Sequence, residues 1–370
     1  MTSPPPPQPK DFKSRASKIH KVVGFEKRYN FALWFIFAGA LFGFTLARFM
    51  YLDFRKNFCP KGVGNGGNSA APGECYYYLN FDRYKIGILL HLAGILPASV
   101  LVVMQFTPYI RHRWIIVHRI SGYCAILLYT VSLVGALMIA RRAFGGGLDV
   151  QVWVGFVGIG VLVCFIISYS NIKRLQIEQH RAWMLRGWFY AGAIITSRLV
   201  MIIATSVISS VGGYYQVWSC AKIEATLSDP SLLLSKYAAC EAYVNGTEAN
   251  AVAVVEANLS GETAVNAGAG LGVSFGMALW LAVAVHAVGV EVYLHLTPRE
   301  AQRLRQVSYQ RQLEAGMRCP GSSGLTTDRL GDAEPWAGAE AKSSGDCASD
   351  LAAVVSSDDE CAQGAKARES

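Results

Sequence analysis

Two histidine-arginine pairs stand at the ends of long apolar segments. "WIIVHRISGY" contains His118 and Arg119, and "IEQHRAWMLRGW" contains His180 and Arg181. Neutral imidazole is a common nitrogen ligand for metals, and b-type haem is held by axial histidines on facing helices. The alternative is that both pairs are interfacial anchors, beside tryptophans that form an aromatic belt. The choice depends on the elements that position these residues.

The composition is that of a membrane protein. Of 370 residues, 52% are apolar and 16% are charged, whereas soluble proteins carry about 25% charged residues. Residues 1–29 are Pro-rich and then basic, and the long apolar runs lie in residues 30–295. Residues 296–370 have too little clustered apolar surface to form a core. We therefore predict a basic N-terminal segment, a transmembrane domain and a disordered tail with these boundaries.

Six segments are apolar over about 20 residues, the length that a membrane-spanning helix needs. They are Asn30–Met50, Tyr84–Tyr109, Ile115–Ala140, Val152–Ser170, Gly187–Val211 and Gly268–Leu294. The sequence thus predicts an all-α, polytopic membrane helical bundle of six transmembrane helices.

Lysine and arginine in the short loops indicate the orientation. The basic N-terminal segment, the "RHRW" loop and the "NIKRLQIEQHRAWMLR" loop fall on one side, which the positive-inside rule makes cytoplasmic. Arg141 and Arg142 fall on the other side and depart from this rule. Six spans return the C-terminus to the cytoplasm, and no cleavable signal peptide precedes the first span. The net charge of +8 gathers beside the spans, so it indicates orientation in a lipid bilayer and not nucleic-acid binding.

The two predicted outer loops each hold two cysteines, Cys59 and Cys75 in 51–83 and Cys220 and Cys240 in 212–267. Four cysteines on the outer side favour disulfides in an oxidising lumen, with four free thiols as the alternative. The shortest loops would pair Cys59 with Cys75 and Cys220 with Cys240, although the sequence leaves the connectivity open.

Two sequons for N-glycosylation, at Asn245 and Asn258, lie in the second of these loops. Their position on the predicted outer side agrees with the cysteines. We therefore expect an integral membrane protein of the eukaryotic secretory pathway, in the plasma membrane or an endomembrane.

Four histidines lie within or at the ends of the spans, and they are the candidate axial ligands of haem b: His91, His118, His180 and His286. "HLAG" and "HRISGY" each supply a glycine within four residues of the histidine, which suits helices packed around a haem. His118 and His180 lie at similar predicted depth, which favours them as a pair. No other metal is expected.

Four arginines are candidate contacts for haem propionates or another anion, since guanidinium groups bind carboxylates bidentately: Arg119, Arg181, Arg186 and Arg198. Arg198 lies near the middle of a span, where an arginine costs about 2.5–3.5 kcal/mol on insertion scales. We expect it to face the bundle interior, towards a propionate, an anionic substrate or backbone carbonyls. No Asp or Glu lies deep in a span, which argues against an intramembrane zinc hydrolase or a proton-coupled transporter.

The elements "LLHLAGILPA", "RHRWIIVHRISGY" and "QHRAWMLRGWFYAGAIITSRL" resemble the pattern of the predicted membrane proteins called domain of unknown function 2306. The resemblance covers roughly residues 34–210, and "SGY" departs from the more usual Gly-Arg-x-Tyr. It implies recurrent positions at His91, His118, Arg119, His180, Arg181, Trp183, Met184, Arg186 and Arg198. His286 is not covered. The layout is also similar to that of transmembrane b-type cytochromes and ferric-reductase-like proteins.

The leading hypothesis is a protein that binds one b-type haem and passes electrons across or along the membrane, as a membrane oxidoreductase with an unidentified electron donor. The alternative is a cofactor-free transporter or receptor-like scaffold, in which Arg198 and the histidines line a polar cavity for a small anion or lipid. A third hypothesis is a purely structural membrane protein.

Overall fold

The computed structural model describes residues 20–25, 27–60, 70–227 and 229–336, and this part of the chain is largely helical with one two-stranded sheet. The elements in chain order are α2 (Arg28–Leu46), η1 (Phe49–Leu52), η2 (Phe54–Phe58), α3 (Glu74–Asn80), α4 (Asp82–Gln105), α5 (Pro108–Arg113), α6 (Ile115–Ile139), η3 (Ala143–Gly145), α7 (Leu148–Lys173), α8 (Ile177–Val211), β1 (Tyr215–Ser219), α9 (Cys220–Thr226), α10 (Leu232–Lys236), η4 (Ala238–Cys240), α11 (Glu241–Val244), β2 (Val252–Glu256), α12 (Ala264–His295), α13 (Pro298–Glu314) and α14 (Thr327–Leu330).

Six helical stretches of the described residues are long and apolar enough to cross a membrane, which confirms the predicted all-α, polytopic bundle. The largest difference is in the fifth, where α8 begins at Ile177 and not at Gly187. Half of the intervening residues are polar, so this stretch is not an apolar run, but most of its residues (Glu, Gln, Arg, Ala, Met and Leu) favour helix. The helix therefore starts well before its apolar run.

The chain divides into two compact units. Unit 1 comprises Met1–Ile159 and Tyr190–His286, and unit 2 comprises Gly160–Phe189 and Ala287–Ser370. Helices α7, α8 and α12 each contribute residues to both units.

In unit 1, glycines bring α4 and α6 into close contact. A Cβ atom added at Gly94 would lie 2.6 Å from the carbonyl oxygen of Leu128, and one added at Gly135 would lie 2.6 Å from the backbone nitrogen of His91. Small residues let membrane helices approach in this way. The backbone around His91 is thus packed directly against α6.

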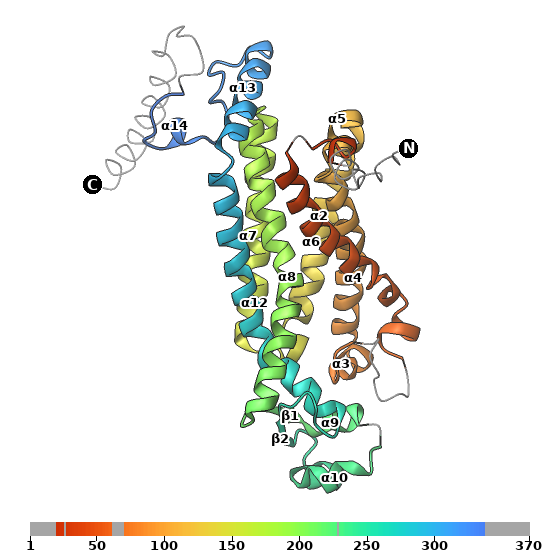
Figure 1. Cartoon of the computed structure of the whole chain (residues 1–370). Coiled ribbons are helices and arrows are strands. Elements are labelled where there is room, and N and C mark those ends of the chain that lie inside the picture. The colour runs from red at the N-terminus through yellow and green to blue at the C-terminus, as the bar shows by residue number, and fades with distance from the viewer. Residues whose placement is uncertain (1–19, 26, 61–69, 228, 337–370) are drawn as a thin grey trace, which may run out of the picture. The chain divides into compact units, whose positions relative to one another are not determined.

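The two loops that contain the cysteines fold into small structures at the same end of the unit 1 helices, where Figure 1 shows α3 and the sheet with α9. Disulfides join Cys59 to Cys75 and Cys220 to Cys240, so the disulfides expected from the sequence are confirmed. We call this part of unit 1 the disulfide end.

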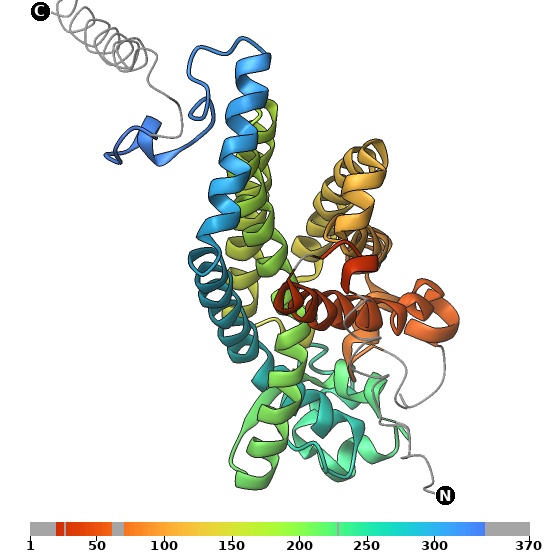
Figure 2. The same cartoon turned by 45° about the horizontal axis from the view of Figure 1, so that its top comes forward.

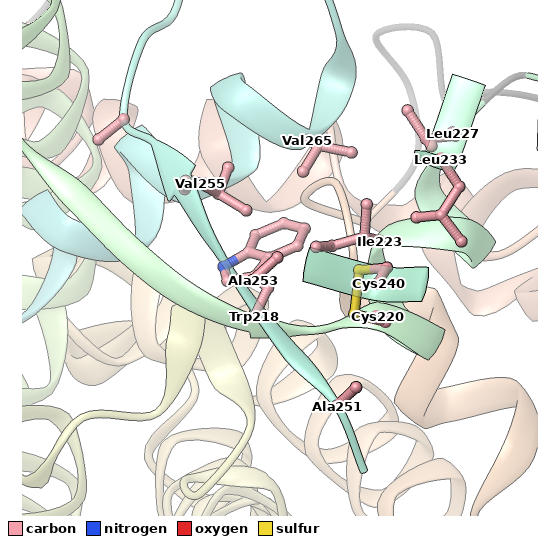
Figure 3. Packing of buried hydrophobic residues seen from close by; sticks show 12 residues of the cluster. Trp218, Cys220, Ile223, Leu227, Leu233, Cys240, Ala251, Ala253, Val255 and Val265 are labelled. Carbon is pink, nitrogen blue, oxygen red and sulfur yellow. A yellow bond between two sulfur atoms is a disulfide. The ribbon is translucent and has the colours of Figure 1, made fainter. Parts of the chain in front are cut away.

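The sheet of the disulfide end is antiparallel and has one buried face. Val217 of β1 lies opposite Val254 of β2. The alternate residues Trp218 and Val255 point inwards to a buried cluster that also contains Ile223 of α9 (Figure 3). This alternation is the ordinary two-residue period of a strand, and it leaves the other face of the sheet exposed.

In unit 2, the segment after α12 is ordered over part of the predicted disordered tail. The sequence predicts disorder from residue 296, but α13 and α14 form within residues 298–330, and α13 follows α12 as a further helix (Figure 2). Residues 337–370 lie outside the described part of the chain.

Buried amide side chains account for this order. Gln312 of α13 donates to the carbonyl of Arg174 at 2.8 Å and accepts from the N–H of Gly321 at 2.6 Å. Gln176 donates to the carbonyl of Gly321 at 2.9 Å. These hydrogen bonds hold the segment on the turn between α7 and α8. The disorder prediction is wrong here because it considers only whether the segment has enough apolar residues to form a core.

Candidate functional site

Arg198 of α8 lies between two aromatic rings of unit 1. Its guanidinium carbon is 4.3 Å from the ring centroid of Phe144 and 4.7 Å from that of Phe275 on α12. Such contacts are attractive because the cation meets the negative face of the ring, the more so where water is excluded. The side chain therefore points at other elements of unit 1.

The carboxylate that faces Arg198 comes from outside the spans. Glu74 is the first residue of α3, next to Cys75, and only 7% of it is exposed. Its Oε1 accepts a hydrogen bond from the N–H of Phe144 at 2.6 Å. Burial raises the pKa of Glu74, while this hydrogen bond and the charges of Arg198 and Lys222 oppose the rise. A loop thus supplies the counter-charge that no span contains.

Phe144 connects Glu74 to Arg198 because its backbone is left-handed, with φ 48° and ψ 50°. This conformation is uncommon for a bulky residue and costs roughly 1–2 kcal/mol. It allows the N–H to reach the carboxylate of Glu74 while the ring covers the guanidinium of Arg198. Local strain that the surroundings enforce is typical of functional positions.

Lys222 is a third buried charge at the disulfide end. It lies two residues after Cys220, is 5% exposed, and its Nζ is 3.3 Å from the ring centroid of Trp218. Burial lowers the pKa of Lys222 to about 7, with Glu74 raising it and Arg142 lowering it further. At neutral pH the amine therefore exists in both charge states.

Arg142, one of the two arginines that depart from the predicted positive-inside pattern, is the fourth charged residue of this group. Its guanidinium carbon is 4.6 Å from the ring centroid of Tyr77, and its Nε donates to the hydroxyl of Tyr84 at 3.4 Å. We call Glu74, Arg142, Arg198 and Lys222 the Glu74 cluster. It combines three cationic side chains with one carboxylate, and a fourth cation, Arg48, acts on Arg198 electrostatically.

The Lys222→Met variant tests this description. The pKa of Lys222 is about 7 in the folded protein and 10.5 for a solvent-exposed lysine, so between these pH values the unfolded chain binds more protons than the folded protein. The stability of the wild type should then rise from pH 7 to pH 9, by up to about 1.4 kcal/mol per pH unit. Thermal unfolding of the detergent-purified protein at several pH values should show a flatter profile for Lys222→Met. Equal profiles for wild type and variant would contradict it, and the exposed Lys236→Met is the control.

Two of the predicted haem ligands are oriented in the same way by a serine of the neighbouring helix. Nδ1 of His91 on α4 is 3.2 Å from the carbonyl oxygen and 2.9 Å from the hydroxyl of Ser132 on α6. Nδ1 of His180 on α8 is 3.2 Å from the carbonyl oxygen and 2.8 Å from the hydroxyl of Ser168 on α7. Both rings are anchored through Nδ1.

The other two histidines are placed differently. Nε2 of His286 is 2.8 Å from the hydroxyl of Thr196, so the nitrogen that would face an iron already has a partner. His118 is half-buried, and its carbonyl accepts from the amide of Gln105 at 2.9 Å. His118 belongs to unit 1 and His180 to unit 2, so the pair favoured by depth does not lie within one unit.

The residues fit a haem only in part. Anchoring through Nδ1 is the arrangement that orients a metal-ligating imidazole, and His91 and His180 have it. The glycines near the histidines, however, leave no space for a haem ring. Gly94 packs on the backbone of α6, and a Cβ atom added at Gly122 would lie 3.2 Å from the amide oxygen of Gln105. Among the described residues, no group of three or more His, Cys, Asp or Glu could hold a metal ion.

Of the other predicted anion-binding arginines, Arg119 belongs to unit 1, and Arg181 and Arg186 belong to unit 2. Arg186 forms two hydrogen bonds with Glu291, of 2.6 and 3.0 Å, and thus binds a carboxylate of the protein itself. Arg181 donates to the hydroxyl of Tyr293 at 3.1 Å. Arg119 is exposed.

The two sequons lie at the disulfide end in different surroundings. Asn245 is exposed in a turn after α11, whereas Asn258 is half-buried and accepts from the N–H of Ser260 at 3.0 Å. Glycosylation at both positions stays a prediction, with Asn245 the more accessible.

Comparison with known proteins agrees with the membrane assignment. Residues 88–228 match the model of a family described as predicted membrane protein (DUF2306), which confirms the resemblance. The match begins later than the predicted range of residues 34–210 and ends later as well. The chain is 25% identical over 333 residues to the Ava biosynthesis cluster protein G of Aspergillus versicolor, covering 78% of this chain and 94% of that protein. No solved structure matches the chain. The family match includes Arg142, Arg198 and Lys222, and it ends before His286.

Proposed function

We propose that this membrane protein binds a small anionic molecule at the Glu74 cluster, as the recognition step of a transporter or receptor-like scaffold. The observation that carries the proposal is the excess of cations over carboxylates in a largely buried place. Buried charges are stable only when they are paired. An anion beside Arg198 and Lys222 would supply the missing negative charge and keep Lys222 protonated.

The surroundings indicate an anion with an apolar or aromatic body. Phe144 and Phe275 cover the guanidinium of Arg198, and Trp218 covers the amine of Lys222. Aromatic rings offer apolar contact surface beside a charged group. The name of the Aspergillus relative refers to a biosynthesis cluster, and an acidic product of small-molecule biosynthesis is the ligand class that we propose.

We further propose that the disulfide end faces the lumen of the secretory pathway or the cell exterior, with both termini in the cytoplasm. Two disulfides need an oxidising compartment to form and persist. The two sequons lie on this same end.

The proposal predicts selective binding of aromatic acids. Benzoate should raise the unfolding temperature of the detergent-purified protein, while the uncharged benzamide should not. Arg198→Gln should weaken benzoate binding by roughly 10- to 100-fold, because hydrogen bonds to charged groups contribute about 1.5–3 kcal/mol. Thermal unfolding measures the stabilisation by benzoate, and isothermal titration calorimetry measures the loss of affinity in Arg198→Gln. Arg198→Lys keeps the charge as a check on folding, and Lys236→Met removes a cation elsewhere in the same loop. Equal responses to benzoate and benzamide would contradict the proposal.

A second candidate, one-electron transfer through a b-type haem in a membrane oxidoreductase, is favoured by the matching anchors of His91 and His180. In unit 1, Nε2 of His91 would hold the iron, with His118 and His286 as the further ligands that the sequence suggests in that unit, and in unit 2 the candidate is Nε2 of His180. A dithionite-reduced-minus-oxidised absorbance spectrum of protein expressed with sufficient haem tests it. A sharp α-band that is lost in His91→Ala or His180→Ala would support this candidate, and a flat spectrum would exclude it.

A further inference from the structure

The outward face of the β1–β2 sheet is apolar and exposed. Its side chains alternate with the buried ones, and the exposed fractions are 60% for Tyr215, 62% for Val217, 53% for Val252 and 62% for Val254. Cross-strand neighbours on this face are Val217 with Val254 and Tyr215 with Glu256. A strand face exposed to water is usually polar. We therefore expect another molecule to cover the apolar face of this sheet.

The buried face of the sheet shows where the sheet lies along the helices. Its side chains share one cluster with Val265 and Ala269 of α12, and Ile208 of α8 packs against that cluster. The N–H of Leu259 donates to the hydroxyl of Ser209 at 2.7 Å. The sheet is therefore fixed beside the first turns of α12 and the last turn of α8.

Helix length gives the depth of this position in a bilayer. The 32 residues of α12 extend about 48 Å at 1.5 Å per residue. A bilayer is about 40–45 Å thick with its headgroups, and its hydrocarbon core about 30 Å. Helix α12 is therefore longer than the hydrocarbon core, so its ends can extend to the level of the headgroups, and the sheet packs against the first of these ends.

We propose that the outward face of the sheet contacts the headgroup layer of the leaflet at the disulfide end. Val207 and Val211, exposed apolar residues at the end of the membrane-spanning helix α8, are followed in the chain by the exposed Tyr214 and Tyr215, so the apolar surface of α8 leads into this face. Tyrosine is enriched at membrane interfaces because its ring is apolar and its hydroxyl is polar. The face has one charged residue, Glu256, at its end.

A second copy of the chain is the other occupant to consider. Stable protein interfaces bury about 800 Å² on each partner, from about 20–30 residues. The sheet offers a few side chains on two strands of five residues each. Lipid, which needs no matching surface, fits a face of this size better.

Photocrosslinking of the full chain tests the proposal. Val254 is replaced by p-benzoylphenylalanine, the protein is reconstituted in phosphatidylcholine nanodiscs at one copy per disc and in liposomes, and the products are identified by mass spectrometry. The control carries the same replacement at Glu248, an exposed loop residue of the same domain. We expect phosphatidylcholine adducts at position 254 at a yield at least fivefold above position 248, in both preparations.

Equal or absent lipid adducts at the two positions would overturn the proposal, because the face would then meet water. Crosslinked dimers in liposomes in place of lipid adducts would overturn it in favour of a second copy. Val217 with the same replacement provides an independent position opposite Val254, so that a folding defect of one variant does not decide the result.

Discussion

Glu74→Gln lowers the free energy of unfolding by about 3 kcal/mol, because it removes the single carboxylate of the Glu74 cluster and leaves buried cations without a counter-charge. Glutamine is of similar size and its oxygen still accepts from the N–H of Phe144, so the variant removes the charge and little else. Arg198 and Lys222 then lie among cations without a carboxylate. Thermal and denaturant unfolding of the detergent-purified protein measures the loss.

Glu262→Gln is the matched control for Glu74→Gln. Glu262 pairs with Lys236 at the surface of the disulfide end, and exposed ion pairs contribute only about 0–1 kcal/mol. The double variant Glu74→Gln, Lys222→Met should recover part of the stability that Glu74→Gln loses. Similar losses for Glu74→Gln and Glu262→Gln would show that Glu74 does not neutralise buried cations.

Replacing both Cys220 and Cys240 by serine should destabilise the second loop by about 3 kcal/mol, the usual contribution of a disulfide that closes a loop of this length. The two cysteines are 20 residues apart, and both are fully buried in the small core of this loop. Both crosslinked residues belong to that core, so we expect rapid proteolysis within residues 212–263 when the crosslink is absent. The membrane helices should stay protected.

The same variant should lose benzoate binding, because Lys222 and Trp218 belong to the loop that unfolds. Limited proteolysis followed by calorimetry separates the two effects. Cys124→Ser, which removes an exposed free cysteine, is the control and should change neither. Protease resistance equal to the wild type in the disulfide variant would show that the loop folds without its crosslink.

The spans could be predicted from the sequence because their signal is local. Each has a run of apolar residues of the length a bilayer requires, and all six appear in the structure. The start of α8 could not be placed, since "IEQHRAWMLR" is helical without being apolar. The N–H of Ile177, at the first position of that helix, donates to Ser308 at 2.8 Å, a partner distant in sequence.

The site was predictable in part. A central Arg198 that needs a counter-charge is visible in the sequence, but its partner Glu74 lies in "GECYYY" of a loop, and a search restricted to spans misses it. The signal that could have found it is the position of charges beside the bonded cysteines: Glu74 precedes Cys75, and Lys222 follows Cys220 by two residues. Each crosslink closes its own loop, so a charge next to a bonded cysteine has little freedom to move.

The amide contacts of unit 2 have a consequence for the time at which the protein assembles. Gln176 stands at the entrance of the fifth span, and its hydrogen-bond partner Gly321 is 145 residues later in the chain. Ribosomes add about 5–20 residues per second, so roughly ten seconds separate the synthesis of the two residues. The turn between α7 and α8 therefore reaches its final form only after all six spans have been made, and until then its buried amides must bond to water or to other partners.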